Sequence, residues 1–234
     1  MDKKQLTKLV SFFTMGDGGV YPVGKEHAFI MNMREVNLDY IDWVNSVLQE
    51  ITRSSYKKIP DYNTDGYTRA PLVRLQTASH PFFSDMRNRI YTGKYKGLDP
   101  HALKLLDAEA LAILYMCDGC LRIEQPNDKK RLVTPSPNVT LNLKRLSYGD
   151  QWLLKKALRD NLGLEWNINR HYEYYYLRLR NKDVSEFMRL VTPHVLPSFE
   201  YKIIRTIGSE KSDDDIVCSI EESIESARNE QAAL

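Results

Sequence analysis

Apolar residues recur at helical spacing in two segments of the chain, and in both the apolar run leads into the dipeptide Asp-Gly. These segments are residues 8–21 and 107–122. This spacing predicts a helix with one buried face, and a following glycine lets the chain leave the helix sharply. The apolar stripes comprise Leu6, Leu9, Val10 and Phe13 in the first helix and Ala110, Ile113, Leu114 and Cys117 in the second. Asp17 and Asp118 therefore occupy matched positions, 101 residues apart.

The elements predicted after each Asp-Gly follow the same order, which indicates a duplicated unit. One or two strands come first, then a helix, a strand with period-two alternation and a last helix. A Tyr-Lys pair closes each copy, with Lys96 in the first and Lys202 in the second. The segments are residues 27–36, 38–51, 70–78 and 81–91, matched by residues 120–124, 138–146, 148–164, 172–180 and 182–195. The order predicts an α+β fold made of two pseudo-symmetric αββαβα repeats.

The linker between the two repeats is expected where Gly, Lys and Pro cluster, around residues 93–100. This places the repeats at residues 1–97 and 98–208 and leaves a third segment whose charge differs from theirs. The remaining segment, residues 209–234, holds eight acidic side chains against two basic ones, a net charge of −6. Because the whole chain carries +2, the two repeats together carry +8. A basic body of this kind favours a polyanionic partner such as nucleic acid.

The composition is that of a soluble globular protein, with 27% charged residues among 234. No run of 18 uncharged apolar residues is present, so we expect no membrane-spanning segment. Three cysteines, an odd number, are typical of an intracellular protein with reduced thiols.

Period-two alternation in the predicted strands separates an apolar face from a polar one. An antiparallel sheet with one solvated face is polar there whatever its role. Matched polar faces in both repeats of a basic body nevertheless favour contact with DNA, because Arg, Lys, Asn and Gln bond base edges and phosphates. The candidate DNA-binding residues are Asn32, Arg34, Arg74, Gln76, Arg122, Asn142, Lys144, Tyr174, Tyr176, Arg178 and Arg180.

A carboxylate at the C-terminal end of an apolar helix needs a positive partner, because the terminal carbonyls already carry partial negative charge. A divalent cation fits, since carboxylates and carbonyls are both hard oxygen ligands. Asp17 and Asp118 are therefore candidate ligands for Mg²⁺, and such a site beside a DNA-binding sheet indicates phosphodiester hydrolysis. Lys96 and Lys202 are candidates to polarise the attacking water or to neutralise charge at the reacting phosphate.

The stretches "TMGDGG" and "YMCDGC" resemble the paired motifs of the LAGLIDADG homing endonucleases, in the single-chain branch that is intron-encoded or free-standing. The Tyr-Lys pairs and "FMRLVTPHVLPSFEYKI" resemble the same branch, so the resemblance covers roughly residues 5 to 205. One departure is the third position of the name motif, where Phe12 and Ile113 replace the expected glycine. The acidic tail has no counterpart in the family pattern.

The resemblance implies a monomeric, site-specific endonuclease that cuts double-stranded DNA and leaves short 3′ overhangs. It implies two sheets that form a saddle over the DNA, and Mg²⁺ or Mn²⁺ bound by each motif aspartate with the preceding carbonyl, here Gly16 and Cys117. The lysines correspond to basic residues near the scissile phosphates, where Lys96 competes with Lys94. The expected location is intracellular: the cytoplasm of a bacterial or phage-infected cell, or an organelle.

Two other readings remain open. Proteins of the same fold include RNA maturases that assist intron splicing and DNA-binding proteins that do not cut, but the presence of both motif acids favours cleavage. A zinc site or a redox pair at Cys117 and Cys120 is disfavoured. The third cysteine, Cys218, lies in the acidic tail, and the histidines show no paired spacing for a four-ligand site.

Overall fold

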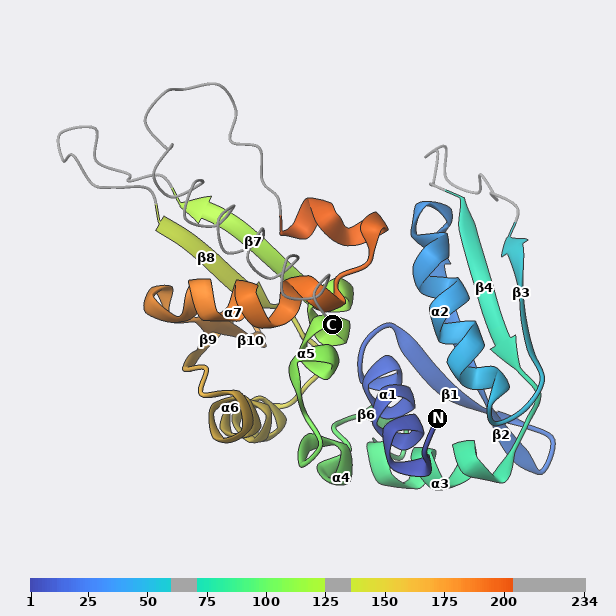
Figure 1. Ribbon diagram of the computed structural model, residues 1–234. Coiled ribbons are helices and arrows are strands. Elements are labelled where there is room, and N and C mark those ends of the chain that lie inside the picture. Colours follow the sequence, from blue (N-terminus) through green and yellow to red (C-terminus); the bar gives the residue numbers. More distant parts are fainter. Residues whose placement is uncertain (60–70, 125–135, 204–234) are drawn as a thin grey trace, which may run out of the picture. The chain divides into compact units, whose positions relative to one another are not determined.

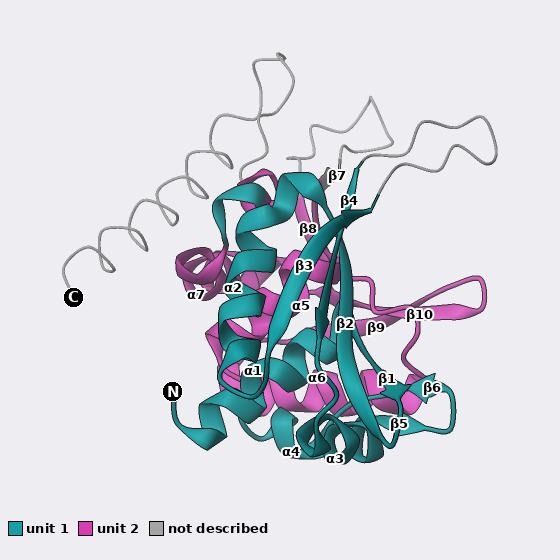
Figure 2. Cartoon of the chain, turned by 90° about the vertical axis from the view of Figure 1, so that its right-hand side faces the viewer, with its two compact units in different colours: residues 1–105, 196–198 teal, residues 106–195, 199–234 magenta. Residues whose placement is uncertain are grey.

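The computed structural model describes the chain except for residues 60–70, 125–135 and 204–234 (Figure 1). The chain divides into two compact units (Figure 2). Unit 1 comprises Met1–Leu105 together with Leu196–Ser198, and unit 2 comprises Leu106–Val195 and the chain from Phe199 onward. The acidic tail predicted from the sequence lies outside the described residues.

Unit 1 holds the first motif helix and a four-stranded antiparallel sheet with the order β1-β2-β4-β3. The chain turns between β1 and β2 at Gly24, which has a φ of 65° that few other residues adopt. Its elements are α1 (Lys3–Met15), β1 (Gly18–Val23), β2 (Glu26–Arg34), η1 (Glu35–Asn37), α2 (Leu38–Gln49), β3 (Ser54–Ile59), β4 (Leu72–Thr77), α3 (Pro81–Ile90), β5 (Tyr91–Thr92), β6 (Tyr95–Lys96) and α4 (Pro100–Leu103).

The core of unit 1 lies between one face of this sheet and the helices α1, α2 and α3. Helix α2 packs along β2, β3 and β4, and α3 packs on β1 and β2. The buried sheet residues are Phe29, Met31, Met33, Val73 and Leu75, and the buried helix residues include Phe13, Tyr40, Val44, Leu48, Phe83 and Met86. Burial of each large side chain stabilises the fold by roughly 1.5–3 kcal/mol, so this face sets which way each strand is turned.

Unit 2 repeats the plan, with a second antiparallel sheet in the order β7-β8-β10-β9. Its core joins this sheet to α5, α6 and α7, and the Phe187 ring makes edge contacts with Tyr115 and Trp166. The elements are α5 (Ala108–Asp118), β7 (Gly119–Glu124), β8 (Ser136–Leu141), α6 (Tyr148–Leu162), β9 (Trp166–His171), β10 (Tyr174–Leu179), η2 (Asn181–Asp183), α7 (Val184–Val191), η3 (Thr192–His194) and the larger part of η4 (Pro197–Lys202), whose first two residues belong to unit 1.

The α+β class and the duplication predicted from the sequence are confirmed, and each unit contains the predicted order of elements. The sheets also gain strands for which the sequence analysis gave no segment: β1 and β3 in unit 1 and β9 in unit 2. All three are edge strands, which pair on one side only. Edge strands are often short and polar, and β3 has four exposed residues in a row. Such a strand carries no alternation to detect.

Candidate active site and nucleic-acid interface

Asp17 stands at the junction of the first motif helix and the first strand. α1 ends one residue before Gly16, and β1 begins at Gly18. The Asp17 side chain is exposed. A Cβ atom on Gly18 would lie 2.5 Å from the ring of Phe29 and 2.7 Å from the carbonyl oxygen of Phe13. The glycine therefore lets the strand leave close against the helix, while the aspartate before it stays in solvent.

Asp118 occupies the matched position in unit 2, where the helix runs directly into the strand. It is the last residue of α5, and β7 begins at Gly119. The Asp118 carbonyl oxygen accepts a hydrogen bond from the backbone amide of Asn142 at 2.8 Å and one from its side-chain amide at 3.4 Å. A Cβ atom on Gly119 would lie 2.0 Å from the ring of Tyr115. The second motif thus also requires a glycine after its aspartate.

Lys96 lies against the end of the first motif helix. Its Nζ donates to the carbonyl oxygens of Thr14 at 2.9 Å, Gly16 at 2.6 Å and Gly18 at 3.0 Å. A lysine ammonium has three N–H donors. Two carbonyl oxygens of the helix end and one of the first strand residue therefore match the three donors of the ammonium, and Lys96 is half-buried there.

Lys202 holds the equivalent place in unit 2. Its Nζ donates to the carbonyl oxygen of Met116 at 2.6 Å, and more distantly to those of Tyr115 at 3.3 Å and Cys117 at 3.4 Å. The Tyr115 hydroxyl donates to the Lys202 carbonyl oxygen at 2.6 Å, so the lysine is tied to α5 by both its backbone and its side chain.

The two lysines supply the positive charge that the sequence required at each motif end. The last carbonyls of a helix carry partial negative charge, and a cation there stabilises it by about 0.3–1 kcal/mol, or up to about 2 kcal/mol when partly buried. Lys94 does not take this place: it is exposed, and its Nζ lies 5.6 Å from the centroid of the Tyr95 ring. Of the two candidates in unit 1, Lys96 is the lysine in contact with the motif.

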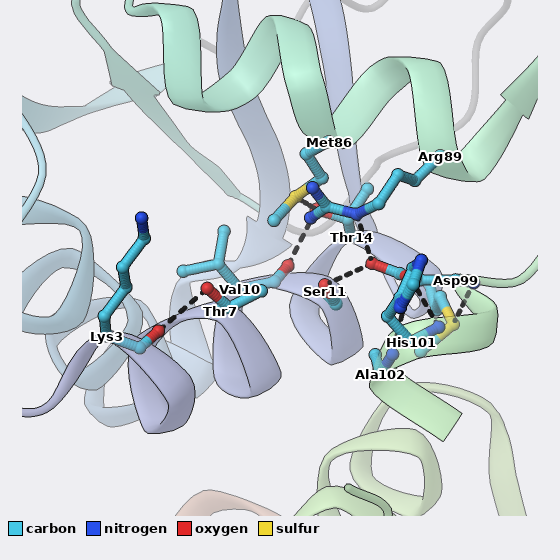
Figure 3. Close-up of polar contacts among 11 residues, drawn as sticks. Lys3, Thr7, Val10, Ser11, Thr14, Met86, Arg89, Asp99, His101 and Ala102 are labelled. Atoms are coloured by element: carbon cyan, nitrogen blue, oxygen red, sulfur yellow. Dashed lines mark hydrogen bonds and ion pairs between the residues drawn. The ribbon is translucent and has the colours of Figure 1, made fainter. Parts of the chain in front are cut away.

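A buried carboxylate fixes the segment that follows Lys96 (Figure 3). Asp99 Oδ2 accepts hydrogen bonds from Ser11 Oγ of α1 at 2.9 Å and from Arg89 Nε of α3 at 3.1 Å. Its Oδ1 accepts the amides of His101 and Ala102 at the start of α4. Burial by itself would raise the pKa of the Asp99 carboxyl, but the bonds from Arg89 and Ser11 outweigh it and hold this pKa below its usual value.

The polar face of the unit 1 sheet carries all four residues predicted there. Asn32 is directly opposite Arg74 across β2 and β4, and Ile30 is opposite Gln76. Residues that face each other in this way share one side of the sheet. Asn32, Arg34 and Gln76 are exposed, and Arg74 is half-buried. Arg74 Nε is buried and has no hydrogen-bond partner among the described residues.

Strand β3 extends this polar face with two residues that sequence reasoning missed. Lys57 pairs with Arg74 and Ser55 pairs with Gln76. Both side chains are exposed, and both line a pocket of about 880 Å³ over β3 and β4. The signal in the sequence was the polar stretch "SSYKKI", which reads as a loop unless an edge strand is considered.

The polar face of the unit 2 sheet follows from the register in the same way. Arg178 is opposite Thr140 of β8 and Asn167 of β9, and Tyr176 is opposite Asn169. On the outer strand, Arg122 is exposed and is opposite Asn138. The exposed side chain of Tyr174 is opposite His171 at the hairpin end of β10.

Three predicted residues of unit 2 lie beyond the strands to which the sequence assigned them. β8 ends at Leu141, so Asn142 follows the strand and bonds the Asp118 carbonyl, and Lys144 lies exposed in a turn. Arg180 follows β10 and is exposed, with its backbone amide bonded to the carbonyl of Glu165. The apolar alternation thus continues past the last residue of each strand.

A model of the LAGLIDADG DNA endonuclease family matches residues 14–187, well over half of the chain. The chain belongs to this family. The matched region begins just before the first LAGLIDADG motif end and includes both motif aspartates.

The relatives of this LAGLIDADG protein are distant in sequence. A RecA protein of Mycolicibacterium flavescens is 27% identical over 196 residues, which cover 81% of this chain and 44% of that protein. The uncharacterized protein MJ1098 of Methanocaldococcus jannaschii is 26% identical over 167 residues, which cover 70% of this chain and 61% of that protein. The chain thus spans less than half the length of the RecA protein that it matches.

A solved structure shares the fold. The homing endonuclease I-WcaI, bound to its DNA recognition sequence, superimposes with a TM-score of 0.68 at 20% identity over 88% of each chain. At this identity the likeness establishes the LAGLIDADG fold. No helix among the described residues is both long and apolar enough to cross a membrane.

The donor atoms at the LAGLIDADG motif ends fit a divalent ion such as Mg²⁺ or Mn²⁺. Each end combines one aspartate with backbone carbonyl oxygens, which are hard ligands. Among the described residues, no three His, Cys, Asp or Glu side chains gather as a metal cage would require. Mg²⁺ needs no such cage, because water and substrate phosphates complete its shell. Neither Cys117 nor Cys120 is part of a disulfide.

Proposed function

We propose that the protein is a site-specific endonuclease that hydrolyses both strands of a DNA duplex in the presence of Mg²⁺ or Mn²⁺ and leaves short 3′ overhangs. The observation that carries this proposal is the repeated motif end. In each unit an aspartate, the last carbonyls of a helix and one lysine ammonium lie together. Membership of the LAGLIDADG DNA endonuclease family supports the same function. Because one chain carries both motifs, we propose that it acts as a monomer.

The polar sheet faces are the proposed contact surfaces for the duplex. In unit 1 these residues are Asn32, Arg34, Ser55, Lys57, Arg74 and Gln76, and in unit 2 they are Arg122, Tyr174, Tyr176 and Arg178. Lysine and arginine attract the phosphate backbone, whereas arginine, asparagine and glutamine also read base edges in the major groove. The unpartnered Nε of Arg74 supports this role, because a buried donor needs an acceptor.

The proposed chemistry is an in-line displacement at phosphorus. A divalent ion would lower the pKa of the attacking water and stabilise charge on the phosphate oxygens. Asp17 and Asp118 would each hold such an ion through the carboxylate, with the carbonyl of the preceding residue, Gly16 or Cys117, as a further ligand. Lys96 and Lys202 keep positive charge within each motif end, where it opposes the negative charge that develops in the transition state.

Selection of cleaved sites from a random DNA library in Mg²⁺ tests the proposal. The wild-type protein should enrich one sequence family, and gels should show both strands of that site cut. Asp17→Asn and Asp118→Asn should each lower cleavage of at least one strand by about 100-fold or more, since even supporting residues of metal sites cost 10–100-fold. Binding of the duplex should persist in both variants. Asp85→Asn, at an exposed aspartate of α3, is the matched control.

Two outcomes would contradict the proposal. Normal cleavage by both motif variants would show that the aspartates are not the metal ligands. Specific binding without cleavage by the wild-type protein would instead indicate a DNA-binding protein that does not cut or, if an intron RNA binds more tightly, a maturase.

The sheet faces can be tested separately through salt dependence. If Lys57 contacts a phosphate, Lys57→Ala should weaken binding to all sequences alike and reduce the slope of log affinity against log salt by about 1. If Arg178 reads a guanine, Arg178→Ala should cost about 1–3 kcal/mol at one base pair only. Unchanged affinity and specificity in both variants would remove these strands from the interface.

A further inference from the structure

Three hairpins among the described residues are closed by two-residue turns of one kind. The turns are Gly24-Lys25 between β1 and β2, Gly93-Lys94 between β5 and β6, and Tyr172-Glu173 between β9 and β10 (Figure 2). Their first residues all have a positive φ: 65° at Gly24, 60° at Gly93 and 55° at Tyr172. Two-residue hairpin turns favour such angles, which glycine adopts without a steric penalty. The third turn therefore places a tyrosine where the other two place a glycine.

Tyr172 is the one non-glycine residue with a positive φ in the part of the chain that the structure describes. A Cβ atom in this left-handed region crowds the following carbonyl oxygen, so the turn is strained. Little burial offsets the strain, because 82% of Tyr172 is exposed. Its ring meets the edge of the His171 ring, and that histidine is exposed as well. Packing within unit 2 therefore does not explain a tyrosine at this turn.

The backbone of the turn does not explain the tyrosine either. The Tyr172 carbonyl oxygen accepts a hydrogen bond from Arg170 Nε at 2.8 Å. Every residue has a backbone carbonyl, so glycine at this position could accept the same bond. What tyrosine adds to the turn is its side chain, which is an apolar ring with a polar hydroxyl at the end.

The turn adjoins the polar sheet face that is proposed above to contact DNA. Tyr174 follows the turn on β10, and Arg178 lies further along the same strand. On the other side of the turn, Arg170 is exposed near the end of β9 and adds positive charge. The acidic side chain of the turn, that of Glu173, is engaged by the Tyr174 hydroxyl. The exposed ring thus stands at the end of a surface suited to a polyanion.

We propose that Tyr172 contacts the sugar-phosphate backbone of the DNA duplex, with its ring against a deoxyribose and its hydroxyl donating to a phosphate oxygen. Tyrosine is among the side chains that bond the DNA backbone in this way. The tyrosine is kept at a strained position for this contact. The inference rests on the proposed function, since the partner is the same duplex, and it adds a contact residue outside the strands. The contact carries no charge and reads no base, so it raises the affinity for all sequences alike.

Three substitutions of Tyr172 separate the hydroxyl, the ring and the strain. Tyr172→Phe removes the hydroxyl alone. Tyr172→Ala removes the ring but keeps a Cβ atom in the strained turn, and Tyr172→Gly removes both. The matched control is Gly24→Ala, because a Cβ atom added there meets no atom within 4 Å and strains the backbone only.

Each variant is measured by thermal unfolding without DNA and by duplex binding in EDTA, where metal-dependent cleavage does not occur. The probes are a pool of duplexes of random sequence and one duplex that the wild-type protein selects from that pool by binding. Single base-pair changes in the selected duplex show whether a variant loses affinity at one position or at all of them.

Stability and affinity should change in opposite directions in Tyr172→Gly. It should melt about 2–4 °C above Tyr172→Ala, because the strain is relieved, and Gly24→Ala should melt below wild type by a similar amount. Both Tyr172→Ala and Tyr172→Gly should bind every duplex about tenfold more weakly, and Tyr172→Phe about threefold more weakly. Their dependence of affinity on salt should match that of wild type, since no charge is removed. Gly24→Ala should bind as wild type does.

Affinities of Tyr172→Ala and Tyr172→Gly within about twofold of wild type overturn the contact, as does a wild-type protein that binds no duplex. A loss confined to one base pair overturns the contact to the backbone. Equal melting of Tyr172→Gly and Tyr172→Ala overturns the strain. Failure of the proposed function looks different: the Tyr172 variants would bind the duplex more weakly as expected, but the wild-type protein would cut no strand in Mg²⁺.

Discussion

The two motif ends each place backbone carbonyls around a lysine ammonium, but the backbone follows a different path in each unit. In unit 1 the helix stops at Met15, and Gly16 and Asp17 form a turn before β1. In unit 2 the helix continues through Asp118 and passes directly into β7. Each lysine nevertheless bonds backbone carbonyls around the end of its motif helix. They are alternate ones in unit 1, at Thr14, Gly16 and Gly18, and successive ones in unit 2, at residues 115–117.

This difference shows why the repeats can diverge and still keep the pair of aspartate and lysine. A backbone carbonyl is present at every residue, so the ammonium does not depend on which side chains surround it. The two ends can therefore carry the same charge on different backbone carbonyls.

The largest effect we expect is from an added methyl group at the motif glycines. Gly119→Ala should lower the free energy of unfolding by about 3 kcal/mol and Gly18→Ala by about 2 kcal/mol, since overpacking typically costs 1–3 kcal/mol. Gly119 has extended backbone (φ −80°, ψ 151°) that alanine adopts freely, so its cost is steric. The nearest atom lies 2.0 Å from its added Cβ, against 2.5 Å at Gly18.

Urea unfolding measures both variants, with Gly149→Ala as the matched control. A Cβ atom at Gly149 would meet nothing closer than 3.8 Å. This control in α6 should be neutral or more stable by up to about 1 kcal/mol, because alanine favours a helix. If Gly18→Ala and Gly149→Ala unfold alike, the first motif end does not need its glycine and the two ends differ more than we infer.

The next largest effect should come from the contacts that fix the segments carrying Lys96 and Lys202. In unit 1 the Asp99 carboxylate makes these contacts. Asp99→Asn should lower the free energy of unfolding by about 2 kcal/mol at pH 7, the usual contribution of a hydrogen bond to a charged group. The folded-state pKa of Asp99 is lowered, so its stabilisation is present above the unfolded pKa of about 3.9 and is lost as the pH falls through the lower folded value.

Unfolding free energies between pH 7 and pH 2 test this anchor. The wild-type protein should lose stability with falling pH more steeply than Asp99→Asn, and the two curves should converge at the acid end. Asp85→Asn, at an exposed carboxylate, should run parallel to wild type. Parallel curves for Asp99→Asn as well would show that the buried carboxylate contributes no pH-dependent stability.

In unit 2 the segment that carries Lys202 is fixed by a neutral group, the Tyr115 hydroxyl. Its removal should therefore lower the stability by less than Asp99→Asn does. Tyr115→Phe deletes the hydroxyl that donates to the Lys202 carbonyl at 2.6 Å and should cost about 1 kcal/mol. The loss should not depend on pH between 4 and 8, in contrast to acid titration of Asp99. A pH-dependent loss would mean that the tyrosine acts through a charged group instead.

The smallest effect should come from Asn142→Ala. The backbone amide of Asn142 holds the Asp118 carbonyl at 2.8 Å and remains in the variant, while the side-chain bond is long at 3.4 Å. We expect a loss of about 0.5 kcal/mol in urea unfolding, and no change in the salt dependence of DNA binding. A reduced salt slope would return Asn142 to the DNA interface that the sequence predicted for it.

The central strands were readable from the sequence because a half-buried strand alternates between two environments. β2, β4 and β10 show this period, and their register confirms that Asn32, Arg74 and Arg178 lie on the polar faces. The edge strand β3 was not readable, because four exposed residues follow one another in it. In β9 the apolar residues Trp166 and Ile168 alternate with asparagines, so a signal was present there and was missed. Lys57 was missed because β3 shows no alternation, and Asn142 was misplaced because the apolar alternation continues past the end of β8.

The sequence alone determined the duplication, the matched pair of Asp17 and Asp118 and the need for a cation at each helix end. These follow from periodicity and from charge beside a helix dipole, which are local properties. Tertiary structure alone decided that Lys96 and not Lys94 meets the motif, and which carbonyls each lysine bonds. Backbone carbonyls are the same at every residue, so only the fold of each unit selects the ones that face an ammonium.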